Sequence, residues 1–392
     1  MTSPTRIPVK PQVLRWARES AGLDIPTAAH RVGVKPERIT AWEAGEAVPT
    51  IRQVRTMAAS YHRPLATLFM ADPIADEKLA RLPDFRRAEH HAEVLPSALQ
   101  RAIMRAYRQR DALVGIAEEL DLPPEEVNAR FKLDPQMNAE VAADELRRAL
   151  AMDSIPDAVV SKPDEFLRQL IRAAERLNVT VIQVQRVALP DMRGFSLGDG
   201  PCPIVALNGA DWPRGKIFSL LHELSHVGFR SNGLCDLEHR SSEEIERKCD
   251  LVAAAALMPR QAFLRRAGDL TGSTMTAEVA RSLGAAFGAS GESATLRMVE
   301  LGRATWDDYW RLKPAFDSAY QKYKAEERER NAGTDTPIFY QLKTRDLGRR
   351  FIRQVLEAHG EEVISSRDAA QLLEVSYDKI PKLAQAAGED VL

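Results

Sequence analysis

The sequence predicts a mostly helical protein of the α+β class, with one small sheet near the middle of the chain. Through most of the 392 residues, apolar side chains recur at helical spacing, and glycine or proline separates the runs. One segment differs, because "VTVIQVQRV" at 179–187 alternates and is rich in β-branched residues, as strands are. The composition is that of a folded chain, since 44% of the residues are hydrophobic and 28% are charged. The length favours two or three domains.

Residues 1–72 are predicted to form an all-α domain of short helices. The run "IPTAAHRVG" ends at Gly33, and "KPERITAWEAG" has Pro36 in its first turn and Gly45 at its end. A further helix follows Thr50, which is a good N-cap residue. These signals are typical of a compact bundle of short helices.

Charge is distributed unevenly along the chain. Residues 1–70 contain ten Lys and Arg and five Asp and Glu, so this segment carries +5 of a total net charge of −2. A small basic module on an acidic body suits contact with a polyanion such as DNA. An ordinary solvated surface explains such an excess nearly as well.

The next segment, 73–175, also predicts helices and serves as a linker or packing region. The strand at 179–187 follows, and then "RGFSLGDGPCPIVALN" places the turn Gly198-Asp199-Gly200-Pro201 between two short strands. This pattern predicts a small antiparallel sheet within a domain at 176–305.

The C-terminal region, 306–392, is again predicted to be helical. We interpret "DAAQLLEVSYDKI" as a small helical hairpin that packs or faces a partner, and not as a second DNA reader. No internal repeat is apparent in the sequence.

Three features favour the cytoplasm and exclude a membrane protein. The cysteines are few and odd in number, Cys202, Cys235 and Cys249, and form no C-x-x-C pair, so a disulfide framework is not expected. The first residues are too polar for a signal peptide, and no apolar run approaches the ~18 residues of a membrane span.

The sharpest motif is H-E-x-x-H, at His222, Glu223 and His226. Residues four apart on a helix project from one face, so the two imidazoles could reach one zinc ion at ~2.0–2.1 Å. Glu223 would lie beside the metal and could take a proton from the water there. The alternative is that two histidines fall four apart by chance.

A third ligand is suggested by Glu246, twenty residues after His226 in a predicted helix at 242–258. Asp250 lies one turn further on the same face, where a carboxylate could hold the other N–H of a ligand histidine. Taken alone, "EEIER" is a solvated acidic face. Cys249 is interpreted as a small buried side chain, and Cys235 as part of a loop.

The block 192–260 resembles the ImmA/IrrE metallopeptidases, through "MRGFS", "PIVALN", "KIFSLLHELSHVGF" and "EEIERKCDLVAAAALMP". The resemblance implies a zincin-like domain that binds Zn2+. It implies that "PIVALN" is an edge strand along which an extended substrate docks by β-augmentation. The residue roles that it implies are zinc ligands for His222, His226 and Glu246, general base and proton shuttle for Glu223, and a supporting carboxylate for Asp250.

Residues 8–70 resemble an XRE/Cro-type helix-turn-helix domain, through "AAHRVGVKPERITAWEAGEAVPT". "LPDFRRAE" at 82–89 resembles the link to an ImmA-type domain. DNA readout is expected to be weak, because Pro36 and Ala41 offer base edges no hydrogen bond. The module could instead mediate homodimerisation or hold a partner. The candidate DNA contacts are Lys35, Glu37, Arg38, Thr40 and Arg52.

Two functions follow from these observations. The first is a cytosolic zinc endopeptidase that cleaves a regulatory protein, for which the resemblance suggests a helix-turn-helix repressor. The second is a non-catalytic transcriptional regulator or antitoxin-like protein that binds DNA and a partner toxin. The complete set of His222, Glu223, His226 and Glu246 favours the enzyme.

Overall fold

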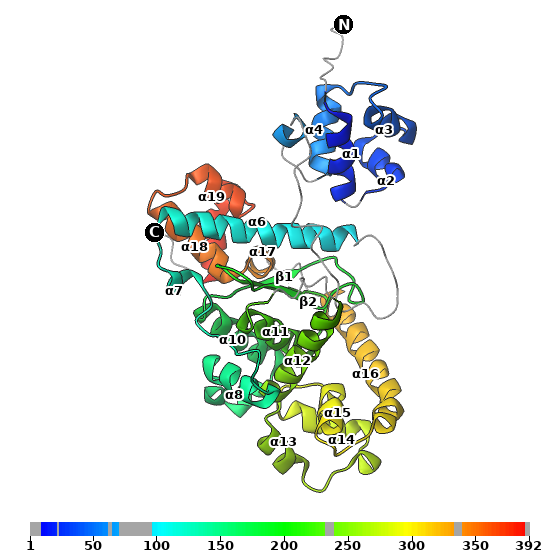
Figure 1. Cartoon of the computed structure of the whole chain (residues 1–392), viewed down its shortest axis with the longest axis vertical. Helices are drawn as coiled ribbons and strands as arrows, with labels where there is room; N and C mark the ends of the chain where they lie inside the picture. Colours follow the sequence, from blue (N-terminus) through cyan, green and yellow to red (C-terminus); the bar gives the residue numbers. More distant parts are fainter. Residues whose placement is uncertain are drawn as a thin grey trace. The chain divides into compact units, whose positions relative to one another are not determined.

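In the computed structural model the chain has the expected α+β character, with many helices and a small three-stranded sheet (Figure 1). The chain divides into two compact units, the first formed by 1–82 with 87–105 and the second by 83–86 with 106–392. In the part of the chain that is described, none of the helices has the length and apolar character that a membrane span requires. The described residues are 9–21, 23–61, 65–69, 96–231, 239–332 and 339–388.

The first unit contains the predicted short helices, coloured blue in Figure 1. Asp24 caps the second helix by accepting a hydrogen bond from the Thr27 amide, and Gly33 ends it with a φ of 74°. Thr50 caps the fourth helix as expected, since its hydroxyl accepts a hydrogen bond from the backbone N–H of Gln53 at 3.3 Å. The elements are α1 (Pro11–Ser20), α2 (Ile25–Val32), α3 (Pro36–Glu43), α4 (Ile51–Ser60) and the 3-10 helix η1 (Leu65–Phe69).

A buried ion pair ties α1 to α3. Arg18 donates to both carboxylate oxygens of Glu43, from Nε at 2.7 Å and from Nη2 at 2.9 Å. It also donates to the Leu23 carbonyl at 2.7 Å. The side chains are only 9% and 5% exposed. Removal of either partner would leave the charge of the other buried and without its main counter-charge, which destabilises the unit.

We therefore expect Glu43→Ala to lower the free energy of unfolding of this unit by about 3 kcal/mol. The guanidinium of Arg18 would stay buried, with only the exposed Glu19 as counter-charge. Hydrogen exchange of the α1 and α3 amides in the full chain measures the loss. Glu37→Ala, at an exposed position on α3, is the matched control. Equal protection in the two variants would contradict the expectation.

The second unit is built on a mixed sheet of β1 (Thr180–Val184), β2 (Gly194–Leu197) and β3 (Ile204–Asn208), in the order β1-β3-β2. The expected β2–β3 hairpin is antiparallel, but β1 runs parallel to β3. After β1 the chain crosses to β2 at the far edge of the sheet, and the β2–β3 hairpin then places β3 between β1 and β2. The expectation that "PIVALN" is an edge strand is therefore wrong, because β3 is central and β2 lies at the edge.

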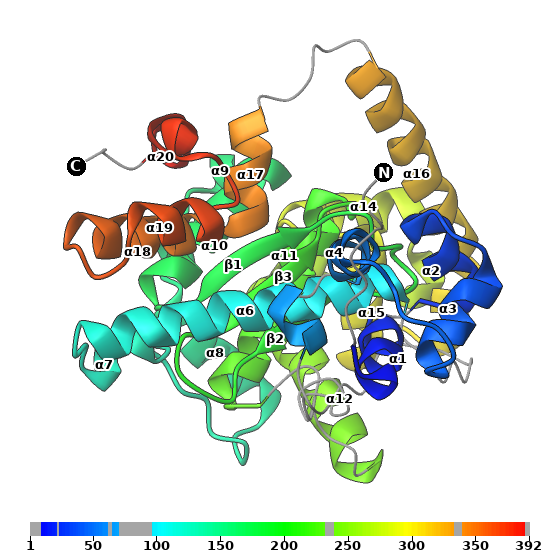
Figure 2. The same ribbon diagram turned by 90° about the horizontal axis from the view of Figure 1, so that it is seen from above.

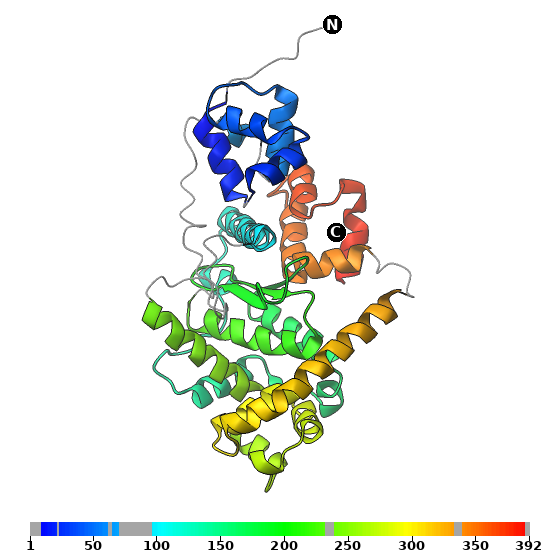
Figure 3. The same ribbon diagram turned by 90° about the vertical axis from the view of Figure 1, so that its right-hand side faces the viewer.

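Helices cover both faces of this sheet. On one face lie α10 (Pro163–Arg176) and α11 (Pro213–Gly228), and on the other lie α17 (Phe339–Leu347) and the C-terminal half of α6 (Ser97–Glu119), as Figures 1 and 3 show. α12 (His239–Leu257) packs against α11 and α8 (Ala139–Ala149).

The remaining helices complete the second unit. They are α7 (Pro124–Val127), η2 (Met152–Ser154), α9 (Asp157–Val160), α13 (Arg260–Ala267), η3 (Gly272–Thr274), α14 (Ala277–Ala285), α15 (Gly291–Glu300), α16 (Trp306–Ala332), α18 (Arg349–Gly360), α19 (Ser366–Leu372), η4 (Tyr377–Lys379) and α20 (Ile380–Ala387).

The main core surrounds α11, which carries the H-E-x-x-H motif. Ile217, Leu220, Leu221, Leu224 and Val227 are all fully buried there. The helix packs between the sheet, α10 and α12. A helix held in this way presents its polar side chains in fixed directions.

Candidate metal centre

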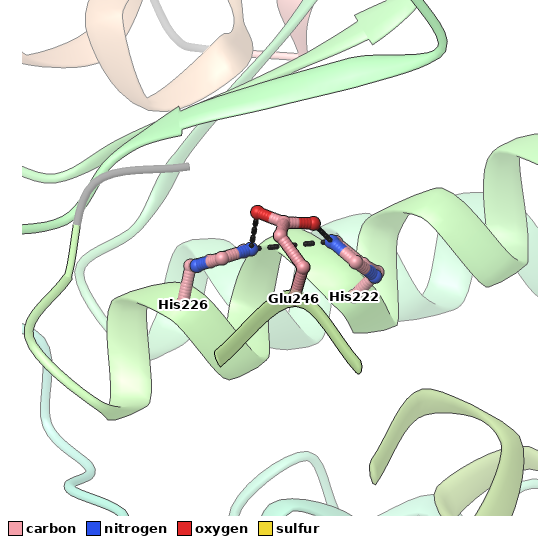
Figure 4. Close-up of side chains that lie close together, drawn as sticks. All are labelled: His222, His226 and Glu246. Atoms are coloured by element: carbon pink, nitrogen blue, oxygen red, sulfur yellow. Dashed lines mark hydrogen bonds and ion pairs between the residues drawn. The ribbon is translucent and has the colours of Figure 1, made fainter. Parts of the chain in front are cut away.

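The two histidines of the motif project from the same face of α11, as the i, i+4 spacing predicts (Figure 4). His222 and His226 are each only 1% exposed. Their Nε2 atoms lie 3.2 Å apart. The helix starts with Pro213 in its first turn and continues unbroken past both rings.

Glu246 reaches this pair from α12. Its Oε2 lies 3.2 Å from Nε2 of His222 and its Oε1 lies 3.0 Å from Nε2 of His226 (Figure 4). Burial alone would raise the pKa of Glu246, but whenever the two rings carry protons on Nε2, their hydrogen bonds to Glu246 outweigh burial and hold that pKa well below its usual range. The third corner of the cluster is therefore an anionic oxygen.

Further hydrogen bonds indicate which ring nitrogens carry protons. Nδ1 of His222 lies 2.7 Å from Oδ1 of Asp250, a carboxylate that can only accept. Nδ1 of His226 lies 3.1 Å from Oγ of Ser231, and that hydroxyl donates to the His226 carbonyl at 3.3 Å. Both Nδ1 atoms are thus assigned as donors. Each Nε2 is left with a lone pair directed at the other ring and at Glu246.

This donor set fits a zinc ion. Two lone pairs and a carboxylate that meet within 3.2 Å repel one another unless a cation lies between them. Ligands at ~2.0–2.1 Å in a tetrahedral site are about 3.3 Å apart, close to the spacing found. Among the described residues, no other His, Cys, Asp and Glu side chains form such a group. Two imidazoles and a carboxylate leave a fourth position open, as in catalytic zinc sites.

Glu223 leaves α11 toward the edge strand β2. Ser196, which is fully buried on β2, donates from Oγ to Oε2 of Glu223 at 2.9 Å. A Cβ at Gly194 would lie 3.0 Å from Oε1, so the absence of a side chain there gives the carboxylate its space. β2 therefore positions the candidate base.

The sequence interpretation missed Ser196, Gly194 and Ser231. The available signal for Ser196 was a hydroxyl within an otherwise apolar strand, which needs a partner once it is buried. Ser231 follows the end of α11, where a serine commonly bonds to the helix terminus.

Cys249 is fully buried, as expected of a packing residue, and neither Cys249 nor Cys202 forms a disulfide. Cys235 and the segment 82–89 lie outside the described residues.

The candidate DNA contacts lie on the surface of the first unit. Lys35, Glu37, Arg38 and Thr40 are exposed on α3 or at its N-cap, and Arg52 is exposed on α4. Arg38 lies over the Trp42 ring at 6.0 Å from its centroid, and the Thr40 hydroxyl donates to the Pro36 carbonyl at 3.3 Å. Both side chains thus have partners within their own helix.

Comparison with known families confirms the two resemblances found in the sequence. Residues 161–298 match the family model of the IrrE N-terminal-like domain, peptidase M78, and residues 12–68 match that of a helix-turn-helix domain. The first match includes the whole sheet together with α11 and α12, and so all the residues of the cluster. Neither the curated proteins nor the solved structures give a significant match.

Proposed function

We propose that this chain, in which an IrrE N-terminal-like domain of the peptidase M78 family follows a helix-turn-helix domain, is a zinc-dependent endopeptidase that cleaves a regulatory protein. The observation that carries the proposal is the convergence of two Nε2 atoms and the Glu246 carboxylate, all within 3.2 Å of one another, on the helix that also carries Glu223 and on its neighbour. A purely structural zinc site would be closed by a fourth protein ligand.

In this proposal His222, His226 and Glu246 hold the zinc ion, while Asp250 and Ser231 orient the two imidazoles. A bound zinc ion would polarise the scissile carbonyl and make the attacking water more acidic. Glu223 accepts the proton of that water and passes it to the leaving amine.

The edge strand β2 is the proposed docking site for substrate, in place of β3. β2 pairs with β3 on one side, and no other described strand pairs with it. An extended peptide could add to it by β-augmentation and would then lie beside the carboxylate that Ser196 holds. A helix-turn-helix repressor in the cytoplasm remains our proposed substrate.

A non-catalytic regulator is the second candidate, and the helix-turn-helix domain is the observation that favours it. In that case the peptidase fold would sense a ligand or hold a partner, such as a toxin. Mass spectrometry of protein N-termini separates the two functions, because only a peptidase creates new N-termini that depend on Glu223.

Ser196→Ala tests the positioning of Glu223. Because hydrogen bonds to charged groups contribute roughly 1.5–3 kcal/mol, we expect kcat to fall at least about tenfold with little change in KM. Steady-state cleavage of a peptide that spans the cleavage site measures both constants. Ser225→Ala is the matched control, since that buried hydroxyl donates to the Leu221 carbonyl of its own helix. A rise in KM alone would show that Ser196 binds substrate instead.

A further inference from the structure

The last helices of the chain, α18, α19 and α20, pack together on α17 and part of α6 (Figure 2). Ala369 of α19, Leu373 at the C-cap of α19 and Leu383 of α20 are fully buried. Ile380 is 6% exposed. The three helices share this apolar cluster and leave the other side of α20 in solvent.

The turn between α19 and α20 has the same construction as the turn between α2 and α3. Ser365 caps α19 by accepting from the amide three residues on, as Asp24 does for α2. Glu374 has a φ of 53° at the position equivalent to Gly33, whose φ is 74°. Left-handed backbone at a residue other than glycine is uncommon and needs support from its surroundings.

Each of four backbone hydrogen bonds around the α2–α3 turn has a counterpart around the α19–α20 turn. The same difference in residue number relates the two members of every pair. In the first unit they are Ala28 N to Asp24 O (2.9 Å), Gly33 N to His30 O (3.3 Å), Val34 N to Ala29 O (3.0 Å) and Arg38 N to Lys35 O (2.9 Å). In the second they are Ala369 N to Ser365 O (2.9 Å), Glu374 N to Gln371 O (3.2 Å), Val375 N to Ala370 O (3.1 Å) and Lys379 N to Ser376 O (2.9 Å).

The side chains that bury these turns also correspond. The first set is Ala28, Ala29, Val32, Ile39 and Trp42, and the second is Ala369, Ala370, Leu373, Ile380 and Leu383. All are buried except Ala370, which is half-buried. Cap, left-handed turn, hydrogen bonds and core positions thus repeat together, and the first copy lies in the matched helix-turn-helix domain.

We propose that residues 365–387 are a second helix-turn-helix unit, and that its second helix, from Tyr377 to Ala387, binds the major groove of duplex DNA. This replaces the interpretation of the segment as a hairpin that packs or faces a partner. The proposal does not depend on the metal centre.

The exposed side of the second helix carries the chemistry that DNA requires. Tyr377 is 56% exposed, and Lys379, Lys382 and Gln385 are also exposed. The lysines can contact phosphates, while the phenol and amide can bond base edges. At the positions equivalent to Pro36 and Ala41 of α3, this helix has Tyr377 and Lys382 and so gains hydrogen-bonding groups.

The acidic residues near this face already have partners. Asp378 accepts a hydrogen bond from the Ser376 side chain, and Glu374 pairs with Lys343. A protein interface would be expected to centre on large apolar side chains. Apart from Tyr377, the exposed positions of this helix carry none. The observations therefore favour DNA over a protein partner.

Two DNA readers in one chain predict a binding site in two parts. To test this, duplexes that bind the full-length chain are selected from a pool of random sequences of about 60 base pairs. This length spans several helical turns of DNA, so that both parts of the site can be present. The selected duplex is then used to measure Kd and nuclease protection. The Glu223→Gln chain serves throughout, so that cleavage cannot interfere and failure of the peptidase proposal leaves this result unaffected.

Lys382→Glu is expected to weaken binding about tenfold or more, to lower the salt slope by about one, and to remove one of two protected segments. Arg38→Glu is expected to remove the other segment. Lys132→Glu, an exposed charge reversal outside both helix-turn-helix segments, should leave the protected segments unchanged. Equal Kd values for Lys382→Glu and Lys132→Glu would overturn the proposal. So would a single protected segment that Arg38→Glu abolishes, or the absence of any retained duplex.

Discussion

Glu223→Gln is expected to keep its zinc and to cleave the protein target about 10²–10⁴-fold more slowly than the unmodified chain. Glutamine has the same shape as glutamate but cannot accept the proton of the attacking water. Its amide oxygen can still accept the Ser196 hydroxyl, so the packing against β2 should persist. Single-turnover cleavage of the purified target, with zinc content measured on the same samples, checks both halves of the expectation.

Glu244→Gln is the matched control for this experiment. It makes the same chemical change at an exposed position on α12, two residues before the proposed ligand Glu246. We expect it to cleave at the unmodified rate. If Glu223→Gln were equally active, the endopeptidase proposal would fail and the non-catalytic regulator would be favoured. If Glu223→Gln lost its zinc, Glu223 would be a ligand and not the base.

The core of the metal centre could be predicted from sequence because its geometry is mostly local. His222 and His226 lie on one helix, where the spacing alone decides that they share a face. Glu246 and Asp250 are related in the same way on the next helix. The contact of Glu246 with both histidines depends on the packing of α12 on α11, which the family resemblance implied and no spacing rule could give.

The contacts around Glu223 could not be predicted in this way. The apolar pattern of "PIVALN" would be the same in a central strand and in an edge strand. Strand order depends on how the chain crosses the sheet, and the residues of a single strand do not reveal it. The partnership of Ser196 with Glu223 follows from that order, since only the edge strand β2 lies beside the carboxylate.

A single residue explains why the second helix-turn-helix segment was not recognised in the sequence. Helix-turn-helix turns favour glycine where the backbone is left-handed, as at Gly33, and the equivalent residue here is Glu374. A glutamate at that position removes the strongest sequence signal of the turn. The backbone hydrogen bonds reveal the repeat because they do not depend on the side chain.

His226→Ala is expected to abolish zinc binding and, with it, the stabilisation that the metal gives to the second unit. The unmodified chain should hold about one zinc ion, and at a thousandfold excess of zinc over Kd the metal adds about 4 kcal/mol to the free energy of unfolding. A chelator should remove that increment from the unmodified chain and change nothing in the variant. Metal analysis and chemical denaturation with and without chelator measure the two effects.

The comparison separates loss of zinc from loss of packing. His226 is buried, so its replacement by alanine also leaves a cavity that destabilises the chain with or without metal. Only the response to chelator isolates the metal, because the cavity is present in both conditions. His30→Ala, an exposed histidine on α2, should respond to chelator as the unmodified chain does. A chelator effect that survives in His226→Ala would place the zinc elsewhere, and then Glu223 would have no activated water beside it.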